Sequence, residues 1–346
     1  MREDDKAQAE RMAGGAVNYT VLRELSEVEA VSSQWDALLE YSTCNRAFSS
    51  SGWFMAACRG TASKLSPYVI VARRGATLAG LLPLVLTEER DAAFPGELSD
   101  YNDMIVREGD TAIMTGLFHQ ALSSAKDYAR LNLKCIRPDA NWMVALRLNG
   151  TSRADAQPLV SRRIVCPYIR LDESYDEYLA TKSANFRHAL KRARGKALED
   201  DVTVRQLTPD SFPQTELAEI FLTLNRARFQ QKSCFKAENE SFVREVLPRL
   251  FLESRLFVFV MCEREEIVGI NLCMRGARSL CYWNGGFLSH AARWSPGKLL
   301  LEAGIREAHA ASLEEYDLMR GTEAYKACWA THTRTISHME LTATSQ

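Results

Sequence analysis

Residues 257–275 read FVFVMCEREEIVGINLCMR, and this stretch decides how the chain must fold. Apolar, β-favouring residues fill both ends, and a charged turn at 263–266 separates them, which predicts a β-hairpin. The earlier stretch 68–86, YVIVARRGATLAGLLPLVL, has the same length and the same plan. The two stretches align without a gap at a constant offset of 189 residues, which places Gly80 on Gly269.

Buried hairpins resemble one another for general reasons, so the shared glycine alone is weak evidence for a repeat. Two predicted helices also precede each hairpin, and further strand and helix follow it, so we predict an internal duplication. The predicted domains are 18–155 and 160–342, behind a leader at 1–17, and a Gly-, Ser- and Pro-containing stretch at 149–160 separates them. The remaining pattern predicts helices at 28–41, after Ser51, and at 116–128, 175–198, 216–231, 240–253 and 297–311, and strands at 19–23, 131–136, 279–285 and 316–319.

Composition excludes several classes of protein. The 346 residues are 46% apolar and 25% charged, which is typical of a globular chain and not of a disordered or collagen-like one. The formal net charge of -1 disfavours a nucleic-acid partner. Nine cysteines without C-x-x-C spacing predict reduced thiols and no metal site. No signal segment or run of roughly 18 apolar residues occurs, so we expect a cytoplasmic protein without membrane insertion.

The segment 293–299, RWSPGKL, follows a predicted strand and opens a helix. Ser295 is a suitable N-cap, Pro296 suits the first helical position, and Gly297 allows a ligand to approach the backbone. The free N–H groups of such a helix attract anions, and Lys298 adds a positive charge. The segment therefore predicts either a phosphate site or an ordinary capped helix.

The segment 316–329, YDLMRGTEAYKACW, places charged groups at the end of a predicted strand. Asp317 lies inside that strand, where an unpaired carboxylate would be costly. It is either a structural carboxylate that holds loop N–H groups or a catalytic base that faces a cleft. Glu323, Tyr325 and Lys326 follow on the adjoining loop or helix.

A basic stripe marks the helix predicted at 175–198. Arg187, Lys191 and Arg194 fall at spacings of four and three residues, opposite an apolar stripe. This pattern is compatible with a solvated helix face, with a cationic wall for an anionic substrate, and, more weakly, with nucleic-acid binding.

These motifs, in this order, resemble the GNAT-type acyltransferases that are grouped with the CelD-like proteins of cellulose biosynthesis. The resemblance covers roughly residues 20–340 and includes SPGKLL at 295–300, FSSSGWF at 48–54, SANFRHALKRARGK at 183–196 and SDYND at 99–103. It implies an α/β fold with two tandem GNAT-like domains and mixed, mostly antiparallel sheets flanked by helices. The first domain of that family is usually degenerate.

The resemblance implies acyl transfer from acyl-CoA, most simply acetyl-CoA as co-substrate, to an amine or hydroxyl of a small molecule or sugar, in polysaccharide biosynthesis. A thioester is already activated, so the protein must position it, polarise its carbonyl and remove a proton. The strand around Trp283 and Asn284 would meet the thioester, and the backbone of Ser295, Gly297, Lys298 and Leu299 would hold the CoA phosphates. Asp317 or Glu323 would take the proton of the acceptor.

For the acceptor, the resemblance points to SDYND, with Tyr101 and Asp103, and to Arg187, Tyr325 and Lys326. The pyrophosphate loop departs from the common GNAT pattern, because only Gly297 remains of its glycines. An acyl carrier protein or an aminoacyl-tRNA, as in the similar FemAB-type transferases, therefore stays open as donor. A degenerate, non-catalytic module of a polysaccharide-synthesis complex is the other alternative, and the sequence does not set the oligomeric state.

Overall fold

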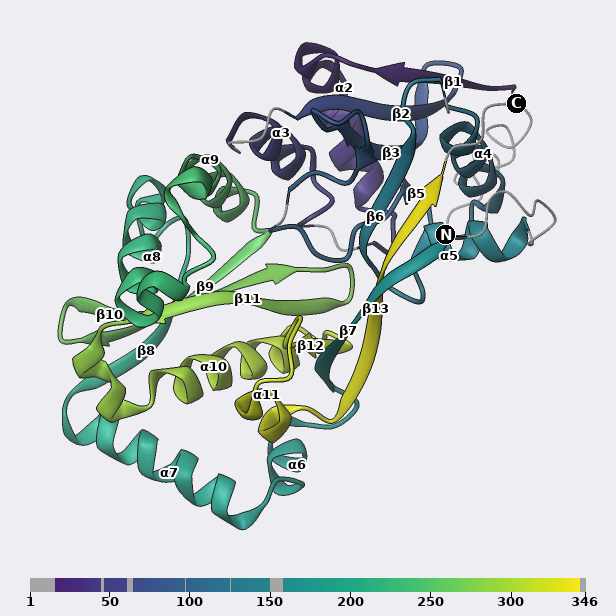
Figure 1. Cartoon of the computed structure of the whole chain (residues 1–346). Helices are drawn as coiled ribbons and strands as arrows, with labels where there is room; N and C mark the ends of the chain where they lie inside the picture. The colour runs from purple at the N-terminus through teal and green to yellow at the C-terminus, as the bar shows by residue number, and fades with distance from the viewer. Residues whose placement is uncertain are drawn as a thin grey trace, which may run out of the picture. The chain divides into compact units, whose positions relative to one another are not determined.

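The computed structural model describes residues 16–44, 47–60, 65–96, 98–124, 126–149 and 158–342 (Figure 1). The chain divides into two compact units: Met1–Arg163 with Ser337–Gln346 form unit 1, and Ile164–Ile336 form unit 2. The chain passes between them within two strands, β7 (Leu159–Arg170) and β13 (His332–Thr342). The C-terminal end therefore groups with the N-terminal half of the sequence.

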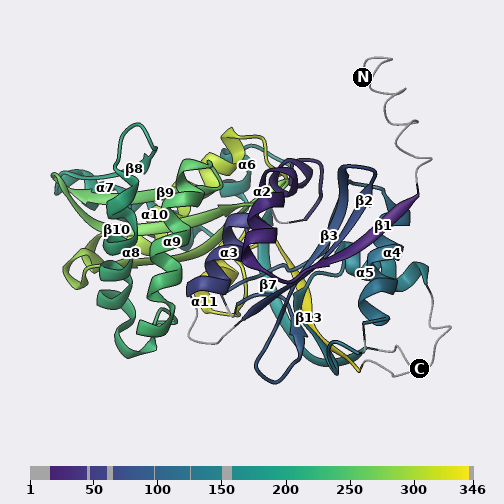
Figure 2. The same cartoon turned by 90° about the horizontal axis from the view of Figure 1, so that it is seen from above.

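Unit 1 contains a mixed sheet with helices on both faces. Its strands are ordered β1-β2-β3-β4-β6-β13, with β5 against β3, and among these pairs only β4–β6 is parallel. Figure 2 shows α2 and α3 on one side of the sheet and α4 and α5 on the other. The elements are β1 (Val17–Leu22), α2 (Leu25–Leu39), α3 (Ser51–Gly60), β2 (Ser66–Arg74), β3 (Thr77–Leu86), β4 (Ala92–Ala93), β5 (Ile105–Val106), α4 (Thr111–Leu122), β6 (Arg130–Ile136) and α5 (Asn141–Leu148).

Unit 2 follows the same plan, with the strand order β7-β12-β11-β10-β9-β8 and β11–β12 as its parallel pair. Helices α8 and α9 cover one face of the sheet, and α10 and α7 cover the other (Figure 1). The elements that follow β7 are α6 (Tyr175–Ala180), α7 (Ala184–Glu199), β8 (Val202–Leu207), α8 (Gln214–Phe229), η2 (Gln230–Lys232), α9 (Ala237–Leu252), β9 (Leu256–Glu263), β10 (Glu266–Arg275), β11 (Ser279–Phe287), η3 (Ser289–Trp294), α10 (Pro296–Ala310), β12 (Glu315–Asp317) and α11 (Ala324–Trp329).

The two predicted hairpins are present and equivalent in detail. Their second strands, Thr77–Leu86 and Glu266–Arg275, differ by 189 residues at both ends. Each hairpin carries a one-residue bulge immediately before its glycine. A Cβ added to Gly80 would lie 2.4 Å from Ile113 of α4, and one added to Gly269 would lie 3.4 Å from Leu300 of α10. The missing side chain therefore makes room for α4 at Gly80, whereas a Cβ at Gly269 would be in ordinary van der Waals contact with α10.

Several predicted elements differ from the structure. The helix predicted at 175–198 is two helices, because the Ser183 hydroxyl accepts the Phe186 N–H and starts α7 anew. The helix predicted at 116–128 begins earlier, at Thr111, where Asp110 accepts the Ile113 N–H. The predicted leader at 1–17 lies outside the described residues up to residue 15, and β1 begins at Val17.

Three properties bear on the class of protein. All nine cysteines lie among the described residues, and none of them is in a disulfide bond. Within the described ranges, no cluster of His, Cys, Asp or Glu side chains has the composition of a metal site. In the part of the chain that the structure describes, no helix combines the length and the hydropathy that a bilayer crossing requires.

Candidate functional site

In unit 2, strands β11 and β12 separate after a short parallel contact. Ser279, Leu280 and Cys281 pair with Glu315, Tyr316 and Asp317, and β12 then ends while β11 continues to Phe287. The register between β10 and β11 shifts at Leu272/Cys273, which makes Trp283 a bulge residue. A bulge beside a strand separation turns side chains and backbone groups away from the regular ladder, which suits a binding site.

The two residues predicted on β11 pack against α8. The Trp283 ring stacks on Phe221 at 6.1 Å and meets the edge of Phe235 at 5.2 Å. The Asn284 side chain accepts a 2.8 Å hydrogen bond from Asn225, which is itself 1% exposed. Asn284 also accepts the N–H of Gly285 at 2.8 Å. Its amide oxygen is therefore fixed by the protein, and this fixes the course of the backbone after the bulge.

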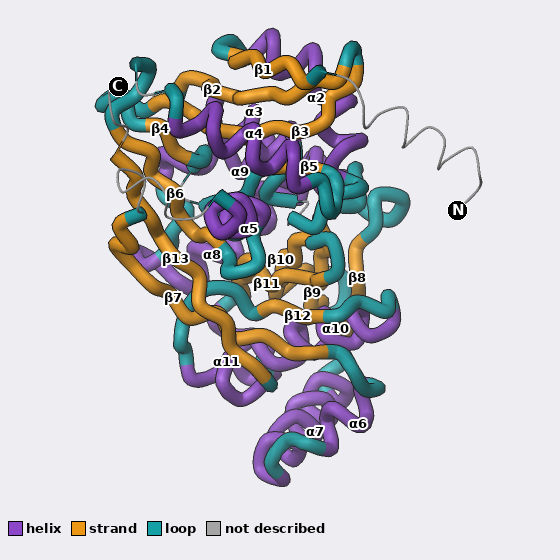
Figure 3. Tube along the Cα trace, turned by 90° about the vertical axis from the view of Figure 1, so that its right-hand side faces the viewer, coloured by secondary structure: helices purple, strands orange, loops and turns teal. Residues whose placement is uncertain are grey.

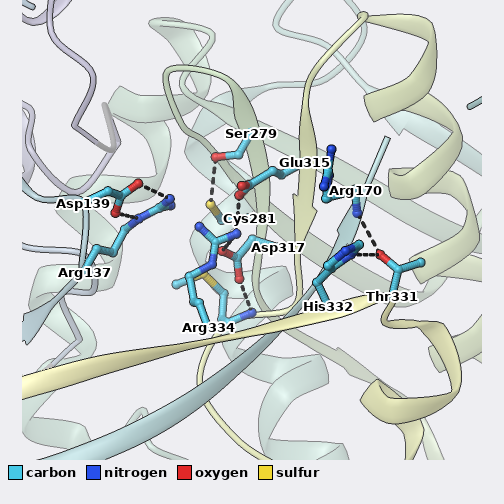
Figure 4. A network of polar contacts seen from close by, with 11 residues as sticks. Arg137, Asp139, Arg170, Ser279, Cys281, Glu315, Asp317, Thr331, His332 and Arg334 are labelled. Carbon is cyan, nitrogen blue, oxygen red and sulfur yellow. Dashed lines mark hydrogen bonds and ion pairs between the residues drawn. The ribbon is translucent and has the colours of Figure 1, made fainter. Parts of the chain in front are cut away.

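Asp317 ends β12 and is completely buried. Its carboxylate accepts the Met319 N–H at 2.7 Å and lies 3.7 Å from the guanidinium of Arg334 (Figure 4). Arg334 also pairs with Glu315 and lies over the ring of Tyr168 at 3.9 Å. These contacts are those of a structural carboxylate, the first of the two interpretations that the sequence allowed, and they leave Asp317 poorly suited to take a proton.

Glu323 and Lys326 form an ion pair of 3.1 Å, in which the carboxylate side chain is 55% exposed and the ammonium side chain 6% exposed. The Lys326 ammonium also donates to the carbonyl of Arg320. Gly321 has a φ of 118°, and a Cβ there would meet the Glu323 carboxylate at 2.2 Å. The lysine thus fastens the loop that follows β12, and the carboxylate above it is open to solvent.

Tyr325, on α11, belongs to a small cluster of hydroxyl groups. It lies close to Tyr282 of β11, which in turn lies close to Arg228 of α8. Burial, reinforced by the neighbouring Tyr282 and Glu323, raises the pKa of Tyr325 above its usual value. Tyr325 is still 37% exposed, so it presents a protonated hydroxyl to the surface at neutral pH.

The start of α10 offers few free donors. Ser295 is the N-cap residue, as predicted, but it has left-handed angles, φ 57° and ψ 54°, and its side chain makes no capping hydrogen bond. The N–H groups of Lys298 and Leu299 both donate to the Ser295 carbonyl, at 2.8 and 3.3 Å. Pro296 has no N–H. Within the described residues, the Gly297 N–H has no acceptor, and a Cβ at Gly297 would meet nothing within 4 Å.

Arg187 has a local contact. Its guanidinium donates to the carbonyls of Ala180 and Lys182, at 2.8 and 2.5 Å, and so holds the junction between α6 and α7. The Arg187 side chain remains exposed. The other candidate site residues in unit 2 from the segment after β11 are Asp317, Glu323, Tyr325 and Lys326.

Tyr101 and Asp103 lie in unit 1 and serve its packing. Tyr101 is 2% exposed and has a φ of 53°. The Asp103 carboxylate accepts the N–H groups of Asn141 and Trp142, at 2.7 and 2.9 Å, and therefore caps α5. Within SDYND, Ser99 also donates to Asn102. The SDYND motif is a buried, hydrogen-bonded loop. The structure gives no support to contact between the Tyr101 or Asp103 side chain and an acceptor.

Asp103 makes the stability of unit 1 depend on pH. Burial outweighs the N–H bonds that its carboxylate accepts and raises its pKa from 3.8 to about 7. The folded chain therefore holds a proton that the unfolded chain releases between these values, so the stabilisation is complete below pH 4 and is lost as the pH rises through 7. At about 1.4 kcal/mol per unit, the loss is up to about 4 kcal/mol. Thermal unfolding of the wild type from pH 4 to 8 should show this loss of stability, and Asp103→Asn should remove the pH dependence. Equal pH profiles of the wild type and the variant would contradict the role assigned to Asp103.

Four residues that hold the site together did not stand out in the sequence: Asn225, Arg228, Glu302 and Arg334. Asn225 carried a signal, because it falls on the apolar stripe of α8, four residues after Phe221. Glu302 carried a similar signal, because it falls among the apolar, buried residues of α10. In the structure this buried carboxylate binds Arg194 and the Tyr175 hydroxyl. Arg228 and Arg334 carried none, because surface arginines are common.

Comparisons with known proteins give the domain type. Residues 184–327 match the family model described as an acetyltransferase (GNAT) domain, so unit 2 carries a GNAT-type acetyltransferase domain. No curated protein matches the sequence. The crystal structure of FemX has a TM-score of 0.64 at 11% identity, and the match covers 94% of this chain and 97% of that one.

Two further solved structures share the fold. The C-terminal domain of a putative lysylphosphatidylglycerol synthetase from Agrobacterium fabrum has a TM-score of 0.59 at 12% identity, over 93% of each chain. L-PGS from Bacillus licheniformis has a TM-score of 0.58 at 11% identity, over 91% of this chain and 92% of that one. The α/β class expected from the sequence, with mixed, mostly antiparallel sheets flanked by helices, is confirmed.

Proposed function

Starting from the GNAT domain at 184–327, we propose that the chain transfers an acyl group from an acyl-CoA thioester to an amine or hydroxyl. The observation that carries this proposal is the separation of β11 and β12 directly after Cys281 and Asp317. The pantetheine arm of CoA is an extended chain with two amides, so it can lie along β11 in place of a strand. The resemblance to CelD-like proteins supports a sugar or another small molecule as acceptor.

In the proposed reaction, the acceptor nitrogen or oxygen attacks the thioester carbonyl carbon, and its proton passes to the Glu323 carboxylate. The carbon–sulfur bond breaks, and the thiolate of CoA leaves and takes a proton from water. Glu323 suits the first step because its side chain is 55% exposed, whereas Asp317 is completely buried. Lys326 pairs with this carboxylate at 3.1 Å and holds it in place.

The phosphates of the donor are assigned to the start of α10, where the Gly297 N–H and the half-buried Lys298 are available. Leu299 is 6% exposed and lies in the core, so it would contribute only its backbone.

A second candidate function is transfer of an aminoacyl group. Two observations favour it. Among the described residues, the first turn of α10 offers a single free N–H, whereas a diphosphate needs several. The solved structures that match over most of this chain include FemX and the C-terminal domain of a putative lysylphosphatidylglycerol synthetase. The latter name describes a lysyl group joined to a lipid. The strand separation and Glu323 would serve this ester donor by the same chemistry.

Thermal unfolding in the presence of ligands separates these candidates. Acetyl-CoA and longer acyl-CoAs should raise the melting temperature of the whole chain by several degrees at about 100 times their Kd, because a ligand of the folded state adds about 2.7 kcal/mol there. No shift with any acyl-CoA would remove CoA as donor. A shift with an aminoacyl adenosine alone would favour the second candidate.

Gly297→Val tests the placement of the phosphates. We expect donor affinity to fall about tenfold or more, because a branched side chain would occupy the approach to the Gly297 N–H, with each such charge-assisted hydrogen bond worth about 1.5–3 kcal/mol. The fold should persist, since a Cβ at this position meets nothing within 4 Å. Ala311→Val, which adds a branched side chain at the exposed far end of α10, is the matched control. Unchanged affinity in Gly297→Val, measured by calorimetry, would place the phosphates elsewhere.

A further inference from the structure

One face of α7 carries positively charged side chains, and several of them have no acidic partner in the described part of unit 2. From Tyr178 to Leu198 the sequence contains no acidic residue, although the whole chain has a net charge of -1. Figures 1 and 3 show α7 at the edge of unit 2, beside α6 and α10. The cationic residues of this stretch are Lys182, Arg187, Lys191, Arg192, Arg194 and Lys196.

Half of these cations are occupied within unit 2. Lys182 donates to the carbonyls of Trp329 and Ala330. Arg187 binds the carbonyls at the start of its own helix, and Arg194 pairs with the buried Glu302. These three side chains have structural reasons to be positive.

The other three cations have no such structural role in the described part of the chain. Lys191, Arg192 and Lys196 are exposed, and none of them pairs with a carboxylate in the described part of the chain. Lys191 and Arg192 line an open surface depression of about 620 Å³ together with Asn185 and His188. These four side chains fall on one helix face, because their spacing is three or four residues.

Gly195 lies on the same face, one turn beyond Lys191 and Arg192. A glycine inside a helix costs about 1 kcal/mol relative to alanine. No internal contact requires it, since a Cβ there would meet nothing within 4 Å. Gly195 does not itself line the depression but lies one turn from Lys191 and Arg192, which do, and a ligand that approaches the helix backbone there is favoured by the glycine.

The opposite face of α7 limits the class of ligand. Leu190, Ala193 and Ala197 are at most 7% exposed and pack into the core of unit 2. The apolar stripe of α7 is therefore buried and not available to insert into a bilayer, and Leu198 at the end of the helix is its exposed large apolar side chain, so charge and hydrogen bonds are the main source of attraction. A guanidinium and an ammonium on adjacent positions, with an amide and an imidazole one turn earlier, match the several oxygens of a phosphate group.

We propose that the outward face of α7 binds a phosphate or diphosphate group through Lys191 and Arg192, with Asn185 and His188 as hydrogen-bonding groups and Gly195 as the point of closest approach. The phosphate belongs either to a soluble phosphorylated molecule or to the headgroup of an anionic phospholipid. The proposal does not depend on the acyl donor, because the donor phosphates were assigned to α10.

The test is calorimetric titration of the full chain with inorganic diphosphate, and co-sedimentation with phosphatidylglycerol vesicles against phosphatidylcholine vesicles. Lys191→Gln/Arg192→Gln should weaken binding about a hundredfold, because each charged hydrogen bond contributes about tenfold or more. Lys232→Gln/Lys236→Gln removes two exposed cations outside α7 and should leave binding unchanged. Gly195→Leu keeps every charge and favours the helix, and it should still weaken binding about tenfold by placing a side chain beside the depression, in the path of a ligand that approaches the helix backbone.

Each outcome is decisive. Diphosphate binding that both α7 variants weaken supports a soluble ligand, and vesicle binding that diphosphate competes away supports a lipid headgroup. Gly297→Val should bind diphosphate on α7 normally even if it loses acyl-CoA, which separates this proposal from the proposed function. No binding of either probe, equal losses in the Lys232/Lys236 control, or no effect of Gly195→Leu would overturn the site. Retention of a single-stranded RNA that diphosphate does not displace would also overturn it.

Discussion

Glu323→Gln is expected to lower turnover by about 10²–10⁴ while the melting temperature changes little. Glutamine has the same shape but cannot accept the proton of the attacking amine or hydroxyl. The structure should tolerate the change, because the Glu323 side chain is 55% exposed and Lys326 keeps its bond to the Arg320 carbonyl. The measurement is release of free CoA from acetyl-CoA with a panel of amines and sugars, read by chromatography.

Glu265→Gln is the matched control, since Glu265 is an exposed carboxylate in the β9–β10 turn of the same unit. Its turnover should equal that of the wild type. If Glu323→Gln retains the same turnover as this control, Glu323 is not the base, and the proton must leave through another group or through water.

Arg334→Met is expected to destabilise unit 2 by about 3–5 kcal/mol. The change leaves the completely buried Asp317 without its guanidinium, and removal of one partner of a buried ion pair leaves the charge of the other uncompensated. It also removes the pairing with Glu315 and the contact with the Tyr168 ring. Urea unfolding of the whole chain at pH 7 measures the loss.

Arg278→Met serves as control, because Arg278 pairs with Glu314 at 3.5 Å and its side chain is 57% exposed. It should cost no more than about 1 kcal/mol. Adding Asp317→Asn to Arg334→Met should recover part of the stability, since the uncompensated charge disappears. A double variant that is less stable than Arg334→Met alone would contradict the structural role assigned to Asp317.

The local signals in the sequence predicted much of the fold. The hairpins at 68–86 and 257–275 were predictable because alternation, turn residues and glycine all act within about 19 residues. The duplication followed from comparing them, and the bulges at the same register add a structural counterpart. The start of α10 was placed correctly at Pro296, whose fixed φ suits a first turn.

The remaining features depend on contacts between distant parts of the chain. Strand β8 (Val202–Leu207) is only six residues long and pairs with β9 (Leu256–Glu263), which lies far along the chain, so its own pattern gave little signal. The Asp317–Arg334 pair and the Asn225–Asn284 bond join segments 17 and 59 residues apart, and no local rule pairs them. SDYND attracted a substrate role from the resemblance, whereas its polar groups cap α5.

Labelling with a photoreactive acyl-CoA, followed by mass spectrometry of the peptides, tests the central claim most directly. The reactive group sits in the acyl chain, so it reports where the thioester end lies. The account predicts labels on β11 at 279–287 and on the segment 318–326 that follows β12, and competition by acetyl-CoA should abolish them. Labels confined to unit 1 or to α7, or labelling that acetyl-CoA does not reduce, would contradict acyl transfer at the separation of β11 and β12.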